Sequence, residues 1–105
     1  APYVARWTTA HPVQCISSIK KALQRKGFSF VEVLSPCPTS YGRLNKMGTT
    51  LDMTKYFKES TINIKLYEKM LAEGKITDKI VIGEFVDIEK EDFNTKYKKF
   101  CSDLK

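Results

Sequence analysis

The strongest constraint on the fold is the junction of a helical pattern and a strand pattern at Gly27. Apolar residues recur at helical spacing over residues 12–26, a proline opens this segment, and Gly27 suits the position just beyond a helix end. Residues 28–34 are almost all apolar or β-branched, which is typical of a strand covered on both faces, as in parallel sheets. A β-prone stretch, 3–7, precedes the helix. We therefore expect a βαβ unit over residues 3–34.

Residues 35–50 are too rich in proline, glycine and polar residues for regular structure, so the sequence predicts a loop. It follows the carboxyl end of a strand, and open α/β sheets place their ligands at that edge. We expect this loop to be functional and close to a cofactor.

The second half predicts helices within residues 51–74 and a third strand over residues 80–86. Gly83 inside that strand indicates a bulge or a close-packing point. A terminal helix is expected to complete the segment 79–105, with lysines near its end. It should bury one apolar face, formed by Phe93, Tyr97, Phe100 and Leu104.

Length and composition favour one globular unit. The chain has 105 residues, of which 42% are hydrophobic and 29% charged, which suits a single modest core and argues against disorder. No apolar run approaches the roughly 20 residues that span a membrane, and no signal-like segment opens the chain, so we expect a cytoplasmic location. Three cysteines form no disulfide framework and fit reduced thiols.

The net charge of +6 lies mainly in residues 1–52, which carry seven basic and two acidic residues. A basic surface attracts nucleic acid, phosphate-bearing cofactors or an acidic protein. The sequence lacks an aromatic platform motif for nucleic acid, so we expect no nucleic-acid partner. A basic nucleic-acid-binding module and a subunit-docking piece without catalysis remain the alternatives to an enzymatic role.

The catalytic inventory is small. His11 precedes a proline and is interpreted as a residue at the helix start, since acid–base work requires oriented partners. Cys15 and Cys101 lie beside apolar helical positions and are interpreted as small buried hydrophobes. Cys37 differs because it lies in the loop between Pro36 and Pro38, which fix the local backbone. By composition alone it is a free thiol or a metal ligand.

Several stretches resemble the β subunit of 2-oxoacid:ferredoxin oxidoreductases, most closely the 2-oxoglutarate type. Together these stretches cover most of the chain. They are Tyr3-Val4-Ala5-Arg6-Trp7, then residues 26–39, which include Ser35-Pro36-Cys37-Pro38-Thr39, then Tyr41-Gly42-Arg43 and Asn45-Lys46, and finally residues 79–86. The resemblance implies that residues 1–105 form the C-terminal portion of a three-layer α/β/α domain that binds thiamine diphosphate. It also implies that residues 3–7 would lose neighbours supplied by the rest of that domain and lie at an exposed sheet edge.

The resemblance implies coenzyme-A-dependent oxidative decarboxylation of a 2-oxoacid, with electrons leaving through a 4Fe-4S cluster to ferredoxin. Cys37 matches the fourth cysteine ligand of that cluster, whereas the other three ligands and the Gly-Asp-Gly motif for magnesium and thiamine diphosphate are missing from these residues. We therefore expect the cofactors only in the full-length enzyme, none in this fragment, and no activity of the fragment alone.

The resemblance further implies that the partners are the other subunits of a hetero-oligomer, ferredoxin, the 2-oxoacid and coenzyme A, with no membrane. Arg43 and Lys46 are candidate contacts to an anionic group of the substrate, coenzyme A or ferredoxin. The alternative for both is solvated surface charge.

Overall fold

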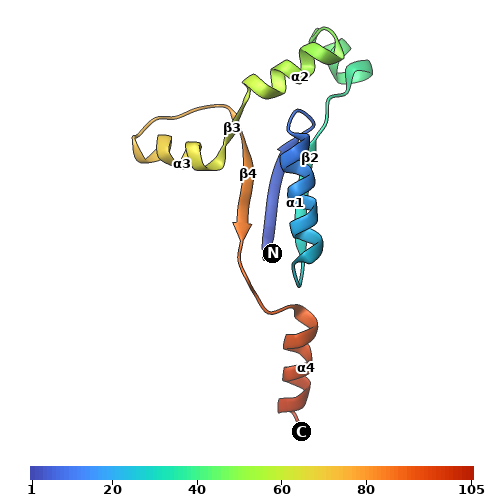
Figure 1. Ribbon diagram of the computed structural model, residues 1–105, viewed down its shortest axis with the longest axis vertical. Helices are drawn as coiled ribbons and strands as arrows, with labels where there is room; N and C mark the ends of the chain where they lie inside the picture. Colours follow the sequence, from blue (N-terminus) through green and yellow to red (C-terminus); the bar gives the residue numbers. More distant parts are fainter.

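A computed structural model describes residues 1–105 as a mixed sheet with helices around it (Figure 1). The elements, in chain order, are β1 (Tyr3–Thr8), α1 (Pro12–Gln24), β2 (Ser29–Leu34), the π-helical turn η1 (Pro38–Gly42), α2 (Thr50–Glu59), β3 (Thr61–Asn63), α3 (Ile64–Ala72), β4 (Ile80–Asp87) and α4 (Phe93–Asp103).

The predicted βαβ unit is confirmed. β1 and β2 pair in parallel, from Tyr3 opposite Ser29 to Thr8 opposite Leu34, and α1 packs on both strands. The strand order is β2-β1-β4-β3, with β4 antiparallel to β1 and parallel to β3. The α/β class expected from the sequence is therefore confirmed, and the sheet is mixed because one of its three pairings is antiparallel.

The core lies along β1. Tyr3, Ala5 and Trp7 are buried together with Ile82 of β4. The expectation that residues 3–7 form an exposed edge is wrong, because β2 and β4 pair with β1 on its two sides. The edge strands are β2 and β3. The expectation that β2 is covered on both faces is wrong, because all of its side chains are half-buried or exposed.

Gly83 is a close-packing point, as its place inside a strand predicts. Its φ is +130°, and a Cβ at this position would lie 2.8 Å from Cγ2 of Ile64. The β1–β4 register also shifts between Val4 and Ala5, which face this part of β4. Glycine therefore allows α3 to approach the sheet at an irregularity in strand pairing.

Two helices occupy most of residues 51–74, as expected, but a short strand separates them. α2 begins with a capping box in which the Thr49 side chain accepts from the Asp52 backbone and the Asp52 side chain accepts from the Thr49 backbone. The Asn63 side chain caps α3. β3 was not expected, because three residues are too few to show an alternating pattern.

The terminal helix is confirmed, but the expected burial of its apolar face is wrong. Phe93, Tyr97, Phe100 and Leu104 are 56–76% exposed. Figure 1 shows α4 extending away from the sheet at the end of the segment that follows β4. The molecule measures 64 × 38 × 23 Å, and its radius of gyration of 18.5 Å exceeds the roughly 13 Å of a compact domain this long.

Candidate functional site

The candidate site is the loop around Cys37, at the edge where β1 and β2 both end. The Thr9 amide donates to the Leu34 carbonyl at 3.0 Å, so the two strand ends are held together. Cys37 follows Leu34 by three residues, and its side chain is exposed. The sequence therefore placed this cysteine correctly at the carboxyl edge of the parallel pair, where α/β sheets hold ligands.

The loop contains a structured turn that the sequence did not predict. Residues Pro38–Gly42 form a single π-helical turn, and Cys37 is its N-cap. The Gly42 amide donates to the Cys37 carbonyl at 2.8 Å, and the Met47 amide donates to the Gly42 carbonyl at 2.9 Å. A cluster of proline and glycine indicates a break in regular structure, so it gave no signal for this turn. Such turns are frequent at functional sites.

A glycine packs this turn against α2. Gly42 is buried, and a Cβ added to it would lie 2.9 Å from Sδ of Met53, whose own side chain is 2% exposed. The same Cβ would lie 3.4 Å from the Cys37 carbonyl oxygen. The contact between Gly42 and Met53 thus fixes the backbone that carries Cys37.

Hydrogen bonds to sulfur favour the thiolate form of Cys37. Backbone N–H groups of Tyr41 and then Ser40 are the largest causes, and the Thr39 side chain adds to them, so that the pKa of Cys37 is lowered to about 7. Thr39 Oγ1 lies 3.8 Å from the Cys37 sulfur. The thiolate is the form that binds metal, and hydrogen bonds to sulfur tune the potentials of iron–sulfur centres. Cys37 therefore fits the requirements of a metal ligand.

The two cations expected to accompany Cys37 lie on the same loop. Arg43 directly follows η1, and the Lys46 amide donates to the Arg43 carbonyl at 3.3 Å. Both side chains are exposed, Lys46 has a φ of +52°, and neither forms an ion pair. Their charges are therefore free to meet an external anion.

The structure does not bring the cysteines together. Cys15 packs against the core cluster on α1, and Cys101 lies on α4. No three His, Cys, Asp or Glu side chains form a group that could hold a metal ion. A 4Fe-4S cluster takes four cysteine thiolates, so Cys37 fits one position of such a site, and no group of three such side chains surrounds it in this chain.

His11 lies at the start of α1, as expected, as its N-cap residue, and its side chain makes no capping hydrogen bond. Its Nδ1 forms a hydrogen bond of 2.7 Å with Thr8 Oγ1, and the Ala10 amide donates to the same Thr8 Oγ1 at 3.1 Å. Burial, and secondarily the charge of Lys58, lowers the pKa of His11. These contacts fix the turn from β1 into α1 at the same sheet edge as the Cys37 loop, and they account for His11 structurally.

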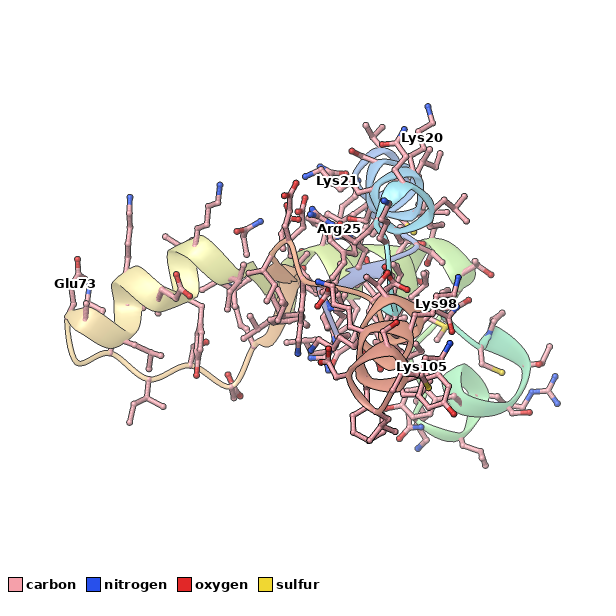
Figure 2. All side chains as sticks on the ribbon, turned by 90° about the horizontal axis from the view of Figure 1, so that it is seen from below. Lys20, Lys21, Arg25, Glu73, Lys98 and Lys105 are labelled. Atoms are coloured by element: carbon pink, nitrogen blue, oxygen red, sulfur yellow. The ribbon has the colours of Figure 1, made fainter.

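Part of the basic surface is neutralised within the chain. Lys21 pairs with Glu84 at 2.8 Å, and Arg25 pairs with Asp87. Figure 2 shows Lys21 and Arg25 on the side of α1 toward β4, whereas Lys20 points away. With the Arg6–Glu32 pair, three of the seven cations in residues 1–52 have acidic partners. This leaves less free charge for a nucleic-acid surface.

No helix is both long and apolar enough to span a membrane.

Comparisons with known proteins give a consistent result, although no family model matches the sequence. The chain is 50% identical over all 105 residues to the 2-oxoglutarate synthase subunit KorB of Methanocaldococcus jannaschii, 38% of which it covers. It is 51% identical over 87 residues, or 83% of the chain, to KorB of Methanothermobacter marburgensis, covering 30% of that protein. It is 30% identical over 97 residues, or 92% of the chain, to the pyruvate synthase subunit PorB of Methanocaldococcus jannaschii, covering 25% of that subunit.

A solved structure has the same fold. It is the 2-oxoglutarate:ferredoxin oxidoreductase from Magnetococcus marinus with 2-oxoglutarate, coenzyme A and succinyl-CoA bound. The TM-score is 0.67 at 22% identity, and the match covers 99% of this chain and 35% of that one. The chain thus spans about a third of the proteins that it matches. Over 83–100% of its length, this chain is similar to KorB subunits of 2-oxoglutarate synthases, in agreement with its resemblance to 2-oxoacid:ferredoxin oxidoreductase β subunits.

Proposed function

We propose that this chain is part of the β subunit of a 2-oxoglutarate:ferredoxin oxidoreductase, in which Cys37 is one thiolate ligand of a 4Fe-4S cluster. The identity of 50% to KorB over all 105 residues supports the enzyme class. The observation that carries the site is the exposed sulfur of Cys37 at the N-cap of η1, where the backbone N–H groups of Tyr41 and Ser40 lower its pKa to about 7. The proposed location is the cytoplasm, where such thiols stay reduced.

In the proposed reaction, a 2-oxoacid and coenzyme A give an acyl-CoA and carbon dioxide, and the electrons pass singly to ferredoxin. Bound thiamine diphosphate would supply the electron sink for decarboxylation, and a 4Fe-4S cluster would supply the electron carrier. Within this chain, the backbone of Ser40 and Tyr41 stabilises the Cys37 thiolate. Pro36 and Pro38 restrict the backbone on either side of it.

Arg43 and Lys46 are proposed to bind an anion next to this cysteine. Their free positive charges suit the carboxylates of 2-oxoglutarate, the phosphates of coenzyme A or the acidic surface of ferredoxin. Charges at the rim of an interface act mainly on association rate and salt dependence. The proposal therefore concerns binding and not the chemical step.

The remaining parts of both cofactor sites are proposed to lie outside these 105 residues, in the rest of the β subunit and in the other subunits. Cys37 does not belong to any group of three or more potential metal ligands within this chain. We therefore predict that the isolated chain purifies colourless and does not bind thiamine diphosphate. Stoichiometric binding of thiamine diphosphate with magnesium in a calorimetric titration would contradict this proposal.

The direct test of the ligand role replaces Cys37 by alanine in the assembled enzyme. The iron content should fall and ferredoxin reduction should be lost, because alanine offers no donor atom to iron. Cys101→Ala is the matched control, since this cysteine lies on α4, well separated from the loop in sequence. Equal iron content and ferredoxin rates in both variants would show that Cys37 is an ordinary thiol.

A second variant tests the anion site. Replacing Arg43 and Lys46 together by alanine should raise the Michaelis constant for the 2-oxoacid, coenzyme A or ferredoxin, with the turnover number retained. Lys65 and Lys69 on α3 are also exposed and form no ion pair, so their double alanine variant controls for net charge. Unchanged Michaelis constants for all three ligands would remove this part of the proposal.

A further inference from the structure

α4 stands apart from the rest of the molecule with its apolar face uncovered. Phe93, Tyr97, Phe100 and Leu104 are 76%, 56%, 60% and 70% exposed. No other helix or strand packs against α4 beyond isolated contacts. Isolated helices shorter than about 12–15 residues are marginal in water, and α4 has 11 residues. Its stability therefore calls for a surface that covers this face.

The spacing of the apolar residues gathers them into one strip along the helix. Phe93, Tyr97, Phe100 and Leu104 follow one another at intervals of four, three and four, which is the a/d spacing of a coiled-coil seam. The rings of Phe93 and Tyr97 are stacked, with centroids 5.8 Å apart, so they already form one continuous strip. We propose that this strip packs against α4 of a second copy of the chain, with the two helices antiparallel.

The charges beside the strip favour that orientation. Lys96 and Asp103 are seven residues apart and lie along the same side of the strip, in the g positions of the heptad. An antiparallel pair places Phe93 against Leu104 of the second copy and Tyr97 against Phe100 of the second copy. Lys96 of each helix then lies opposite Asp103 of the other, which gives two complementary ion pairs.

A parallel pair lacks this complementarity, because Lys96 would lie opposite Cys101 of the second copy. Asn94 and Cys101 occupy the other side of the strip and face each other only in the antiparallel pair. Lys98 on α4 and Lys105 just beyond its end, both labelled in Figure 2, are also seven residues apart and lie outside the seam positions. The strip is small beside a standard interface of about 800 Å² per partner, so the association is weak and depends on concentration.

Sedimentation equilibrium of the 105-residue chain over a range of concentrations measures this association. The unchanged chain should shift from monomer toward dimer as its concentration rises. Phe100→Asp should remain monomeric, and Lys98→Asp, a change outside the seam on the same helix, should still dimerise. Because α4 lies outside the core, circular dichroism should show both variants folded. A wild-type chain that stays monomeric, or a Phe100→Asp variant that dimerises, overturns the proposal.

A charge swap tests the pairing itself. Lys96→Glu and Asp103→Lys should each weaken dimerisation, since each places like charges opposite one another twice. An equimolar mixture of the two variants should recover it as a heterodimer, because every flanking pair is then of opposite sign. A mixture that associates no better than either variant alone would show that the strip does not pair in this way.

Cross-linking fixes the orientation. Asn94→Cys should form disulfides with Cys101 of the second copy under mild oxidation, and peptide mapping by mass spectrometry identifies the bridged positions. Positions 94 and 101 of one helix are seven residues apart, or about 10 Å, which is too far for a bridge within a chain. Lys96→Cys is the second variant to test. If it forms the disulfide with Cys101 of the second copy and Asn94→Cys does not, the pair is parallel, which contradicts the proposed arrangement.

Discussion

β1 and α4 both carry large apolar side chains but lie in opposite surroundings. β1 lies between two strands, and its residues Tyr3, Ala5 and Trp7 are 0–7% exposed. α4 lies beyond the sheet with an aromatic face open to solvent. The comparison shows that an apolar pattern identifies the face of a helix or strand that is suited to burial. The pattern does not indicate whether residues of the same chain pack against that face.

α1 illustrates the same distinction within one helix. It faces the sheet with the small residues Cys15, Ser18 and Ala22, whereas Val13 and Leu23 are 75% and 82% exposed. Ser18 takes part because its hydroxyl accepts from the indole N–H of Trp7 at 2.6 Å. The larger apolar residues of α1 thus form an outer surface.

The largest expected difference between the two regions is in stability. Trp7→Ala should lower the free energy of unfolding by about 3–5 kcal/mol, because it empties the centre of the core. Phe100→Ala on α4 should change it by no more than about 0.5 kcal/mol, since that side chain is 60% exposed. Urea unfolding of dilute protein, monitored by circular dichroism, measures both. Comparable losses in the two variants would contradict the assignment of the core to β1.

Two glycines with positive φ separate the cost of a strained backbone conformation from the cost of overpacking. Gly83→Ala should cost about 1–2 kcal/mol for its backbone conformation, and overpacking against Ile64 should add about 1–3 kcal/mol. Gly74 has a φ of +77°, and a Cβ added to it would meet nothing within 4 Å, so Gly74→Ala should carry only the first cost. Differential scanning calorimetry of the two variants measures the difference. Equal melting temperatures would mean that α3 does not press on β4.

Helix caps outside the core should respond to pH. Hydrogen bonds from Thr49 lower the pKa of Asp52, and those from Thr95 lower the pKa of Asp92. A carboxyl group with a lowered pKa in the folded state stabilises that state above its unfolded pKa of about 3.9, and this contribution is lost as the pH falls through the folded value. Helicity should therefore decline in acid below about pH 4. Asp52→Asn should remove part of that decline, and an unaltered acid profile would exclude this cap as its source.

Exposed Cys37 and half-buried Cys15 should differ in reactivity. A pKa of about 7 for Cys37 predicts that its alkylation by iodoacetamide rises to half its maximal rate near that pH, well below the ordinary thiol value of about 8.5. Peptide mapping distinguishes the two sites in one sample. Thr39→Ala should move the Cys37 profile upward, because one hydrogen bond to the sulfur is lost. A profile for Cys37 centred near the ordinary thiol value would refute the turn as a thiolate-stabilising structure.

The sequence predicts local elements better than their neighbours. The βαβ unit follows from a helical period that ends at Gly27 and runs into an apolar strand, and the close packing at Gly83 follows from a glycine inside a strand. The centre of the sheet was not predictable in this way, because the pairing of β4 with β1 joins residues about 80 positions apart. α4 was expected to be buried because its period is clear, although periodicity carries no information about partners.

The candidate site was also predictable only in part. Cys37, Arg43 and Lys46 were singled out from a polar loop after a strand and from the family resemblance. The turn that favours the thiolate depends on backbone N–H groups of Ser40 and Tyr41, which have no signature in side-chain sequence. The role of Gly42 depends on its contact with Met53, eleven positions further along the chain.

The most direct test of the proposed role of Cys37 is electron paramagnetic resonance of the reduced, fully assembled enzyme carrying Cys37→Ser. We expect the native 4Fe-4S signal to be lost or replaced by one of different shape, because a hydroxyl oxygen is a harder ligand than a thiolate. Cys101→Ser should retain the native signal. A native signal of full intensity in Cys37→Ser, with unchanged iron content, would contradict the assignment of Cys37 as a cluster ligand.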